Sequence, residues 1–198
     1  MKIGLQITKN EKKYDRLLSL IKSDFSQDVD FIHIPDEDSL KSNFKNLDAL
    51  VCYGIKKENF DYRSDKLKWI HIGASGVDGN LFPELIKSKV MITNAKGINA
   101  KPVAEFIMSQ ILYFSKQLHS CEAFKQNRVW NQWELAKNTL QLSDLTLGII
   151  GYGEIGKELS KLAKPFGMKV MAVSRSRKDP ESFIDWFGQF DEIEKLLK

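Results

Sequence analysis

Short apolar runs alternate along the chain with stretches in which apolar residues recur at helical spacing. Five such runs fall within the first 100 residues, at 2–7, 31–34, 49–54, 69–73 and 90–94. Between the first two runs, the period of an amphipathic helix is kept by Tyr14, Leu17, Leu18 and Ile21. Strands that alternate with helices imply a parallel sheet with both faces covered. We therefore predict that residues 1–100 form one small α/β domain.

A long apolar helix is predicted to begin near Lys101 and Pro102, because proline is well accommodated in the first turn of a helix. Its apolar residues cover more than one face, which is typical of a helix buried between layers, domains or subunits. The next stretch, 121–142, carries Trp130 and Trp133 among polar residues. Two interpretations stay open: an extended arm whose tryptophans pack on a partner, or a plain loop within the domain.

An apolar strand at 144–150 runs directly into residues 151–156, whose sequence is G-Y-G-E-I-G. An amphipathic helix follows and ends at Gly167, and residues 169–173 form another apolar strand. The pattern G-x-G-x-x-G is a weak signal alone. Inside a β-α-β unit of about 30 residues, however, it is the phosphate-binding turn of dinucleotide-binding domains. The sequence therefore predicts such a domain in the second half of the chain.

Each glycine of this turn has a separate expected role. Gly151 permits the tight turn, Gly153 lets the backbone approach a pyrophosphate, and Gly156 lets the helix lie close to the strand. The free N–H groups and the dipole at the start of the helix then face the phosphates. A tight strand–helix turn that binds no ligand is the alternative.

The end of the following strand bears on which dinucleotide is bound. NAD sites usually place an Asp or Glu there to accept hydrogen bonds from the ribose 2′-hydroxyl. This sequence has no carboxylate there before Asp179, and instead has Ser174, Arg175 and Arg177. A hydroxyl and two guanidinium groups suit a 2′-phosphate, so we expect NADP to be favoured, with NAD as the second choice. A solvated basic turn is the alternative.

Amino-acid composition limits the class of protein, its partners and its cellular compartment. With 42% hydrophobic residues, the 198-residue chain can bury a real core. Its net charge of +4 is small and its basic and acidic residues are mixed, so no nucleic-acid partner is predicted. Cys52 and Cys121 are too few for a disulfide framework and lack metal-ligand spacing, which favours a reducing cytoplasm and predicts no metal site. No signal peptide or long apolar segment is recognised, so no membrane association is expected.

Several segments together resemble the D-isomer-specific 2-hydroxyacid dehydrogenase family, over essentially the whole chain. They are the end of the fourth strand, the crossing into the second half, the glycine turn, and the second strand with its basic turn, at 67–78, 94–105, 145–156 and 166–178. The resemblance implies a flavodoxin-like substrate domain at 1–100, followed by an incomplete Rossmann dinucleotide-binding domain at 101–198. It also implies NAD(P)-dependent hydride transfer between 2-keto and 2-hydroxy acids.

The resemblance assigns roles on the substrate side. Backbone amides of Ser75, Gly76 and Val77 would hold the carboxylate of a small 2-keto or 2-hydroxy acid, since small residues expose their N–H groups to an anion. A simple glycine turn is the alternative. Val103 would lie near the nicotinamide ring, and a role confined to the helix core is the alternative.

On the cofactor side, the resemblance implies that Gly153, Glu154 and Ile155 contact the pyrophosphate mainly through backbone atoms. The long helix and the segment with Trp130 and Trp133 would lie where family members dimerise about a two-fold axis. A homodimer is therefore expected.

The family's catalytic groups have no counterpart in this sequence. Hydride transfer to a 2-keto acid needs a cation that polarises the carbonyl and a proton donor. The family takes an arginine, and a histidine oriented by a carboxylate, from the later nucleotide domain. Here no histidine follows His119 and no arginine follows Arg177. We assign no catalytic residue, and we expect His71, on a strand near the substrate loop, to be a core residue.

We therefore expect a shortened family member that lacks activity alone. A non-catalytic NADP-binding or dimerisation module and an unrelated doubly wound domain are the alternatives. About two of the six strands of a complete nucleotide domain are expected, which leaves the first of them as an exposed edge. Such an edge predicts low stability or solubility, or stabilisation by dimerisation through the long helix.

Overall fold

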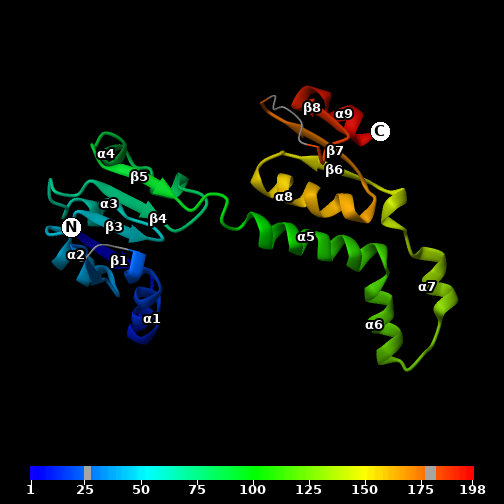
Figure 1. Ribbon diagram of the computed structural model, residues 1–198, viewed down its shortest axis with the longest axis horizontal. Helices are drawn as coiled ribbons and strands as arrows, with labels where there is room; N and C mark the ends of the chain where they lie inside the picture. The colour runs from blue at the N-terminus through cyan, green and yellow to red at the C-terminus, as the bar shows by residue number, and fades with distance from the viewer. Residues whose placement is uncertain (25–27, 177–181) are drawn as a thin grey trace. The chain divides into compact units, whose positions relative to one another are not determined.

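The computed structural model describes residues 1–24, 28–176 and 182–198. Within these ranges the chain divides into two compact units, Met1–Lys96 and Gly97–Lys198. Figure 1 shows each unit built around its own parallel sheet. The predicted α/β class is confirmed, and the division falls close to residue 100, where the sequence placed a domain boundary.

The first unit holds a five-stranded parallel sheet in the order β2-β1-β3-β4-β5. Its strands are β1 (Lys2–Gln6), β2 (Asp30–His33), β3 (Ala49–Cys52), β4 (Trp69–Ile72) and β5 (Met91–Asn94). This is the flavodoxin-like strand order, in which the order reverses next to β1. All five strands were predicted, each within a few residues of its observed bounds.

Helices cover both faces of this sheet. They are α1 (Glu11–Ile21), α2 (Glu37–Phe44), α3 (Lys57–Phe60) and α4 (Pro83–Ile86), with short 3-10 turns at Lys22–Asp24 and Asp78–Asn80. Alternate residues of each strand enter different cores, because successive side chains of a strand point to opposite faces. Ala49 packs with Ile3 and Leu5, whereas Leu50 packs in a second cluster with Phe44.

The second unit holds a three-stranded parallel sheet in the order β6-β7-β8. Its strands are β6 (Thr146–Ile150), β7 (Lys169–Ser174) and β8 (Trp186–Gln189). The expectation of about two strands was therefore wrong, because β8 is a four-residue strand whose brief pattern was not recognised. Among the described residues β6 pairs only with β7, so it is an edge strand as expected, and Ile150 is exposed.

Helices and short 3-10 turns surround this smaller sheet. The longer ones are α5 (Ala100–Ser115), α6 (Leu118–Gln126), α7 (Gln132–Asn138), α8 (Glu154–Ala163) and α9 (Ile193–Leu197), and 3-10 turns lie at Leu142–Asp144, Lys164–Phe166 and Phe190–Glu192. Helix α5 packs on α8 and buries Ala104 and Met108 in the core of this unit. Its other side exposes Phe106 and Phe114, so the prediction that apolar residues cover more than one face of α5 is confirmed.

The segment 121–142 is not a plain loop, because most of it forms α6 and α7, and the prediction that its tryptophans pack on a partner stays a prediction. Left-handed backbone at Gln117 separates α5 from α6, and the same conformation at Arg128 follows α6. Neither α6 nor α7 contains a buried residue in the described structure, so no apolar periodicity marked them in the sequence. Local bonds begin α7 instead, since the Asn131 side chain accepts from the Glu134 amide.

Candidate functional site

The glycine turn joins β6 to α8 without a side-chain cap. Gly151 has φ +93°, in the left-handed region that only glycine adopts readily, and its N–H donates to the Val173 carbonyl on β7. A side chain added at Gly151 or Gly153 would meet no described atom within 4 Å. The backbone of the turn therefore faces open space at the start of a ten-residue helix, which suits the approach of an anion.

Two buried residues hold this turn on the core. A Cβ at Gly156 would lie 3.1 Å from the Ile149 side chain and 3.3 Å from the Gly151 carbonyl, so α8 packs on β6 as closely as the sequence predicted. Tyr152, between the first two glycines, is 1% exposed, and its ring contacts Phe187 edge-on at 5.7 Å. Sequence reasoning missed this anchor, although an aromatic residue between two exposed glycines was a visible signal.

A cavity of about 510 Å³ lies over the turn and the end of β7, and we call it the glycine-turn cavity. It brings Gly151 and Gly153 together with Ser174 and Arg175, as the sequence analysis required of a dinucleotide site. Its full lining is Ile150, Gly151, Tyr152, Gly153, Ser174, Arg175, Ser176 and Phe190. Arg177, the other predicted phosphate ligand, lies outside the described residues.

Ser174 and Arg175 differ in what they offer to a phosphate. The Ser174 side chain is largely buried, and its hydroxyl donates to the Ser176 carbonyl, so this hydrogen is already used within the turn. Arg175 is exposed at the cavity. A phosphate needs donors, so in this geometry Arg175 rather than Ser174 supplies the group that can bind one.

The other predicted cofactor residues lie on the first turns of two helices. Glu154 and Ile155 are exposed at the start of α8, next to the glycine turn. Val103 lies in the first turn of α5 and is half-buried, and it is not among the residues that line the glycine-turn cavity.

In the first unit, the predicted substrate loop follows β4, and we call residues 74–77 the amide loop. Three of its carbonyl groups accept hydrogen bonds from residues outside the loop. The Ala74 carbonyl accepts from the Ala95 amide at 3.1 Å, and the Ser75 carbonyl accepts from Asn94 Nδ2 at 2.7 Å. The Val77 carbonyl accepts from the Asn80 amide at 2.7 Å.

The amide groups of the same loop, in contrast to its carbonyl groups, have no hydrogen-bond partner in the described structure. Within the described ranges, the N–H groups of Ser75, Gly76 and Val77 donate to no protein acceptor. Ser75 and Gly76 are exposed, so water or a ligand can reach their N–H groups. A loop with bound carbonyls and free amides presents partial positive charge, and a carboxylate is a ligand that such charge attracts.

Two further residues at this edge of the sheet were not predicted. Tyr53, at the end of β3, is exposed, and a Cβ at Gly73 would lie 3.2 Å from its ring. Asn94 is the last residue of β5 and reaches back to Ser75 across the neighbouring strand. Tyr53 follows β3 and Asn94 ends β5, and this position at the carboxyl end of a strand was the available signal.

The histidines and cysteines lie in structural settings. The ring nitrogens of His71 and His33 contact the Thr93 hydroxyl and the Thr8 carbonyl, and His119 lies beside aromatic rings of α5. Burial raises the pKa of the Cys52 thiol to about 11, which keeps it protonated at neutral pH. Within the described residues no carboxylate orients a histidine as a proton donor, and no group of three His, Cys, Asp or Glu side chains could hold a metal ion.

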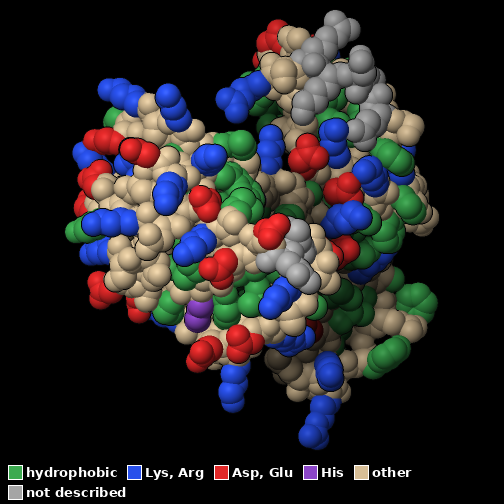
Figure 2. All heavy atoms as spheres, turned by 60° about the vertical axis from the view of Figure 1, so that its left-hand side comes forward, with side chains coloured by type: hydrophobic (Ala, Val, Ile, Leu, Met, Phe, Trp, Pro, Cys, Tyr) green, Lys and Arg blue, Asp and Glu red, His purple; other side chains and the backbone are tan. Residues whose placement is uncertain are grey.

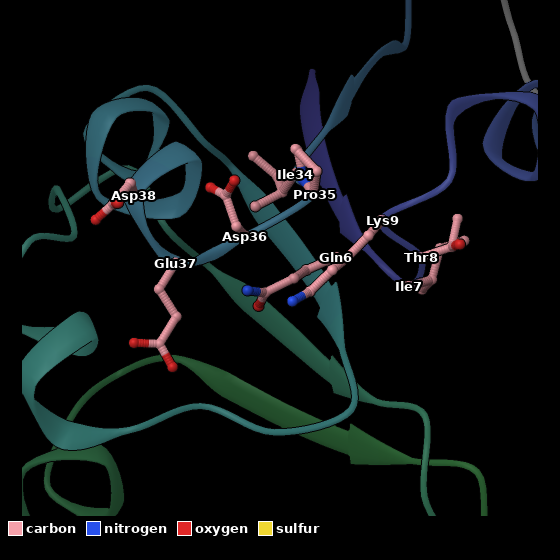
Figure 3. Close-up of a pocket in the computed structure, with 9 residues that line it drawn as sticks. All are labelled: Gln6, Ile7, Thr8, Lys9, Ile34, Pro35, Asp36, Glu37 and Asp38. Carbon is pink, nitrogen blue, oxygen red and sulfur yellow. The ribbon is translucent and has the colours of Figure 1, made fainter.

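A second hollow, of about 640 Å³, lies beyond the carboxyl ends of β1 and β2 (Figure 3). Its carboxylates have structural roles. Asp36 caps α2 by accepting from the Ser39 amide at 2.8 Å, and this bond lowers the pKa of the Asp36 carboxyl. Glu37 pairs with Lys56 at 2.6 Å, which lowers the pKa of the Glu37 carboxyl. We assign no ligand to this hollow.

The surface chemistry agrees with the mixed charge pattern of the sequence. Figure 2 shows Lys and Arg side chains interspersed with Asp and Glu side chains over the face in view. Among the helices that the structure describes, none has the length and apolar character to cross a membrane.

Comparison with known proteins agrees with the family resemblance noted in the sequences of the glycine turn and the amide loop. The model of the D-isomer specific 2-hydroxyacid dehydrogenase NAD binding domain matches residues 108–198. The glyoxylate reductase of Thermococcus litoralis is 31% identical over 171 residues, which are 83% of this chain and 51% of that protein. The chain therefore spans about half the length of the curated relatives it matches.

Solved structures extend the likeness over nearly the whole fold. A D-isomer specific 2-hydroxyacid dehydrogenase family protein from Aeromonas salmonicida matches with a TM-score of 0.82 at 24% identity, over 99% of this chain and 60% of that one. A probable 2-hydroxyacid dehydrogenase from Rhizobium etli, solved with NADP, matches with a TM-score of 0.73 at 19% identity, over 99% and 58%.

These likenesses agree in the region that the residues themselves single out. The matched segment contains the glycine turn, and the matched folds include the sheet that carries the amide loop. The family that these comparisons support for the chain is the D-isomer-specific 2-hydroxyacid dehydrogenase family.

Proposed function

We propose that this chain binds a nicotinamide dinucleotide at the glycine turn and a small 2-keto or 2-hydroxy acid at the amide loop. The observation that carries the proposal is the open backbone of the turn, with Gly151 in the left-handed region and free space above Gly153. Glu154 and Ile155 would hold the pyrophosphate through backbone amides, and Gly153, whose N–H donates to the Gly151 carbonyl at 2.9 Å, would contact it by close approach of the backbone. Val103 would lie near the nicotinamide ring, and the bound nicotinamide would supply the hydride.

NADP is the preferred dinucleotide in this proposal, and NAD is the weaker ligand. The support is Arg175, which is exposed at the cavity in a turn that has no carboxylate before Asp179. A guanidinium can form charge-assisted bonds to a 2′-phosphate, whereas a carboxylate at this position would accept from a 2′-hydroxyl. Arg177 is proposed as a second cation for the same phosphate, on its sequence position alone.

The carboxylate of the organic acid is assigned to Ser75, Gly76 and Val77. Their unbonded N–H groups can donate to both oxygens of one carboxylate. Polarising the keto group and delivering a proton would require a cation and an acid, and we assign neither role to a described residue beside this loop. We therefore propose binding without turnover by this chain alone, in a reducing cytoplasm and without nucleic acid or membrane as a partner.

We also propose a homodimer through the second unit. The exposed side of α5 presents Phe106 and Phe114 at an apolar cavity of about 470 Å³. A second apolar cavity, of about 450 Å³, lies between α6 and α7 beside Trp130. Exposed apolar side chains that gather in one region are typical of protein interfaces. Light scattering after size exclusion tests this part, with twice the chain mass expected and a monomer at micromolar concentration counting against it.

Titration of the 198-residue chain with NADPH and with NADH, followed by the fluorescence of the bound nicotinamide, tests the cofactor proposal. We expect saturable binding of both, with NADPH the tighter. Incubation with NADPH and glyoxylate should leave absorbance at 340 nm unchanged in the same preparation. Equal affinity for the two dinucleotides would remove the NADP preference, and measurable NADPH oxidation would remove the claim of binding without turnover.

A further inference from the structure

The amide loop is braced by a side chain from the neighbouring strand. Strands β4 and β5 are parallel neighbours, and Asn94 is the register partner of Ile72 at the end of β4 (Figure 1). One residue later, the Ala95 amide lies 3.1 Å from the carbonyls of both Ile72 and Ala74. The last residues of β5 therefore continue beside the loop and bind it after the strand pairing has ended.

The Asn94 bond extends this brace to the centre of the loop. Its Nδ2 donates to the Ser75 carbonyl at 2.7 Å. Because the peptide unit is planar, holding the Ser75 carbonyl also fixes the direction of the Gly76 N–H in the same unit. Since the Gly76 amide has no protein acceptor in the described structure, this bond orients a free donor.

We propose that Asn94 is a positioning residue that keeps the amide loop ready to bind a carboxylate. This inference rests on the proposed function, which assigns the substrate carboxylate to the loop. Asn94 itself is not required to contact the ligand. Without its bond, the Ser75–Gly76 peptide unit can turn, and the Gly76 N–H is no longer held in one direction before the anion arrives. The ordering would then have to occur on binding, and affinity would fall.

Nuclear magnetic resonance of the ¹⁵N-labelled 198-residue chain tests this directly. Sodium glyoxylate is titrated at constant ionic strength against sodium chloride as the reference salt. In the wild-type chain the amide signals of Ser75, Gly76 and Val77 should shift saturably. Asn94→Ala should weaken glyoxylate binding about threefold to tenfold, the range expected for one lost hydrogen bond. Before any glyoxylate is added, the same amides should show faster backbone motion in this variant.

Asn43→Ala is the matched control. Asn43 Nδ2 also donates to a backbone carbonyl, that of Ser39, at 2.9 Å in the same unit, but inside α2. The control loses the same kind of bond and should keep both glyoxylate affinity and loop order. Asn94→Leu, which keeps the branched shape without the donor, provides a second variant should the alanine variant fold poorly.

The possible failures are distinguishable. In one outcome, the wild-type loop signals shift with glyoxylate, and both Asn94 variants bind glyoxylate within twofold of the wild-type affinity and with equal loop order. The positioning role is then wrong and the substrate site stands. If the wild-type loop does not respond to glyoxylate at all, the substrate site and the role of Asn94 are both overturned. NADPH binding at the glycine turn is measured separately and decides the cofactor proposal alone.

Discussion

The glycine turn and the amide loop present the same kind of group, backbone N–H donors beyond the carboxyl end of a parallel strand, but they hold it differently. The turn depends on residues within a few positions of one another, with Gly151 in a left-handed conformation and Gly156 against β6. The amide loop depends on Asn94, 19 residues away from Ser75 along the chain. Of the two anion cradles that we propose, one would thus be encoded locally and the other assembled from neighbouring strands.

The largest effect is expected at Gly156 of the glycine turn, where α8 packs closely on β6. Gly156→Val would force a side chain against Ile149 and the Gly151 carbonyl, and overpacking of this kind costs about 1–3 kcal/mol. Thermal unfolding should move to lower temperature, and NADPH binding should be lost because the turn is displaced. Gly153→Ala is the control for stability, since its new methyl group meets no described atom within 4 Å. Equal unfolding temperatures for the two variants would contradict the close packing.

The next effect concerns the charge beside the turn. Arg175→Asp should weaken NADPH binding about tenfold or more, the size of one charge-assisted hydrogen bond, and should weaken NADH binding less. The two dissociation constants, measured by nicotinamide fluorescence, give the ratio. Arg128→Asp makes the same charge change in the same unit, between α6 and α7, and should leave the ratio unaltered. An equal loss of affinity for both dinucleotides would show that Arg175 does not bind the 2′-phosphate.

A smaller effect is expected at Gly73 in the first unit, which lies between β4 and the amide loop. Gly73→Ala would bring a methyl group 3.2 Å from the exposed ring of Tyr53, which can move aside. We expect a stability change within about 0.5 kcal/mol, as for surface positions, measured by thermal unfolding. A loss as large as that of Gly156→Val would mean that the amide loop is packed as rigidly as the glycine turn.

The last prediction concerns a pH-dependent side-chain brace in the second unit. Asp185 accepts from Lys164 Nζ at 2.7 and 2.8 Å and from the Val170 amide at 2.7 Å, and these bonds lower the pKa of the Asp185 carboxyl. A lowered folded pKa gives stability that is present above the unfolded value, about 3.9, and is lost as pH falls through the folded value.

Asp185→Asn should therefore reduce stability at pH 6 by at most about 1 kcal/mol, because the pair is partly exposed, and by less at pH 3. Thermal unfolding at the two pH values measures this difference. Glu158→Gln, which removes an exposed pair with Lys161 on α8, is the comparison. The brace would be refuted if Asp185→Asn lost the same stability at both pH values.

The sequence predicted most strands and the glycine turn because their constraints are local. Residues 144–156 carry a buried strand, a fingerprint and a helix start within one short stretch. The helices α6 and α7 were missed because they bury no residue and so show no apolar period. The strand β8 was missed because four residues carry too little pattern.

The same reasoning explains which of the proposed site residues the sequence could indicate. Arg175 was predicted because its meaning depends only on its place after a strand. Asn94 was not, because its contact with Ser75 requires that β4 and β5 be neighbours in a known register. The use of the Ser174 hydroxyl hydrogen within its own turn was likewise invisible, since it depends on the direction of the Ser176 carbonyl.

The two tryptophans beside and within α7 give the molecule an optical property. Trp130 and Trp133 are 88% and 73% exposed, whereas Trp69 and Trp186 are partly buried in their sheets. Much of the indole emission of this chain should therefore come from water-contacting rings, red-shifted and readily quenched by acrylamide. Any partner that covers α7 would turn that emission toward the blue, so the chain carries its own reporter of assembly.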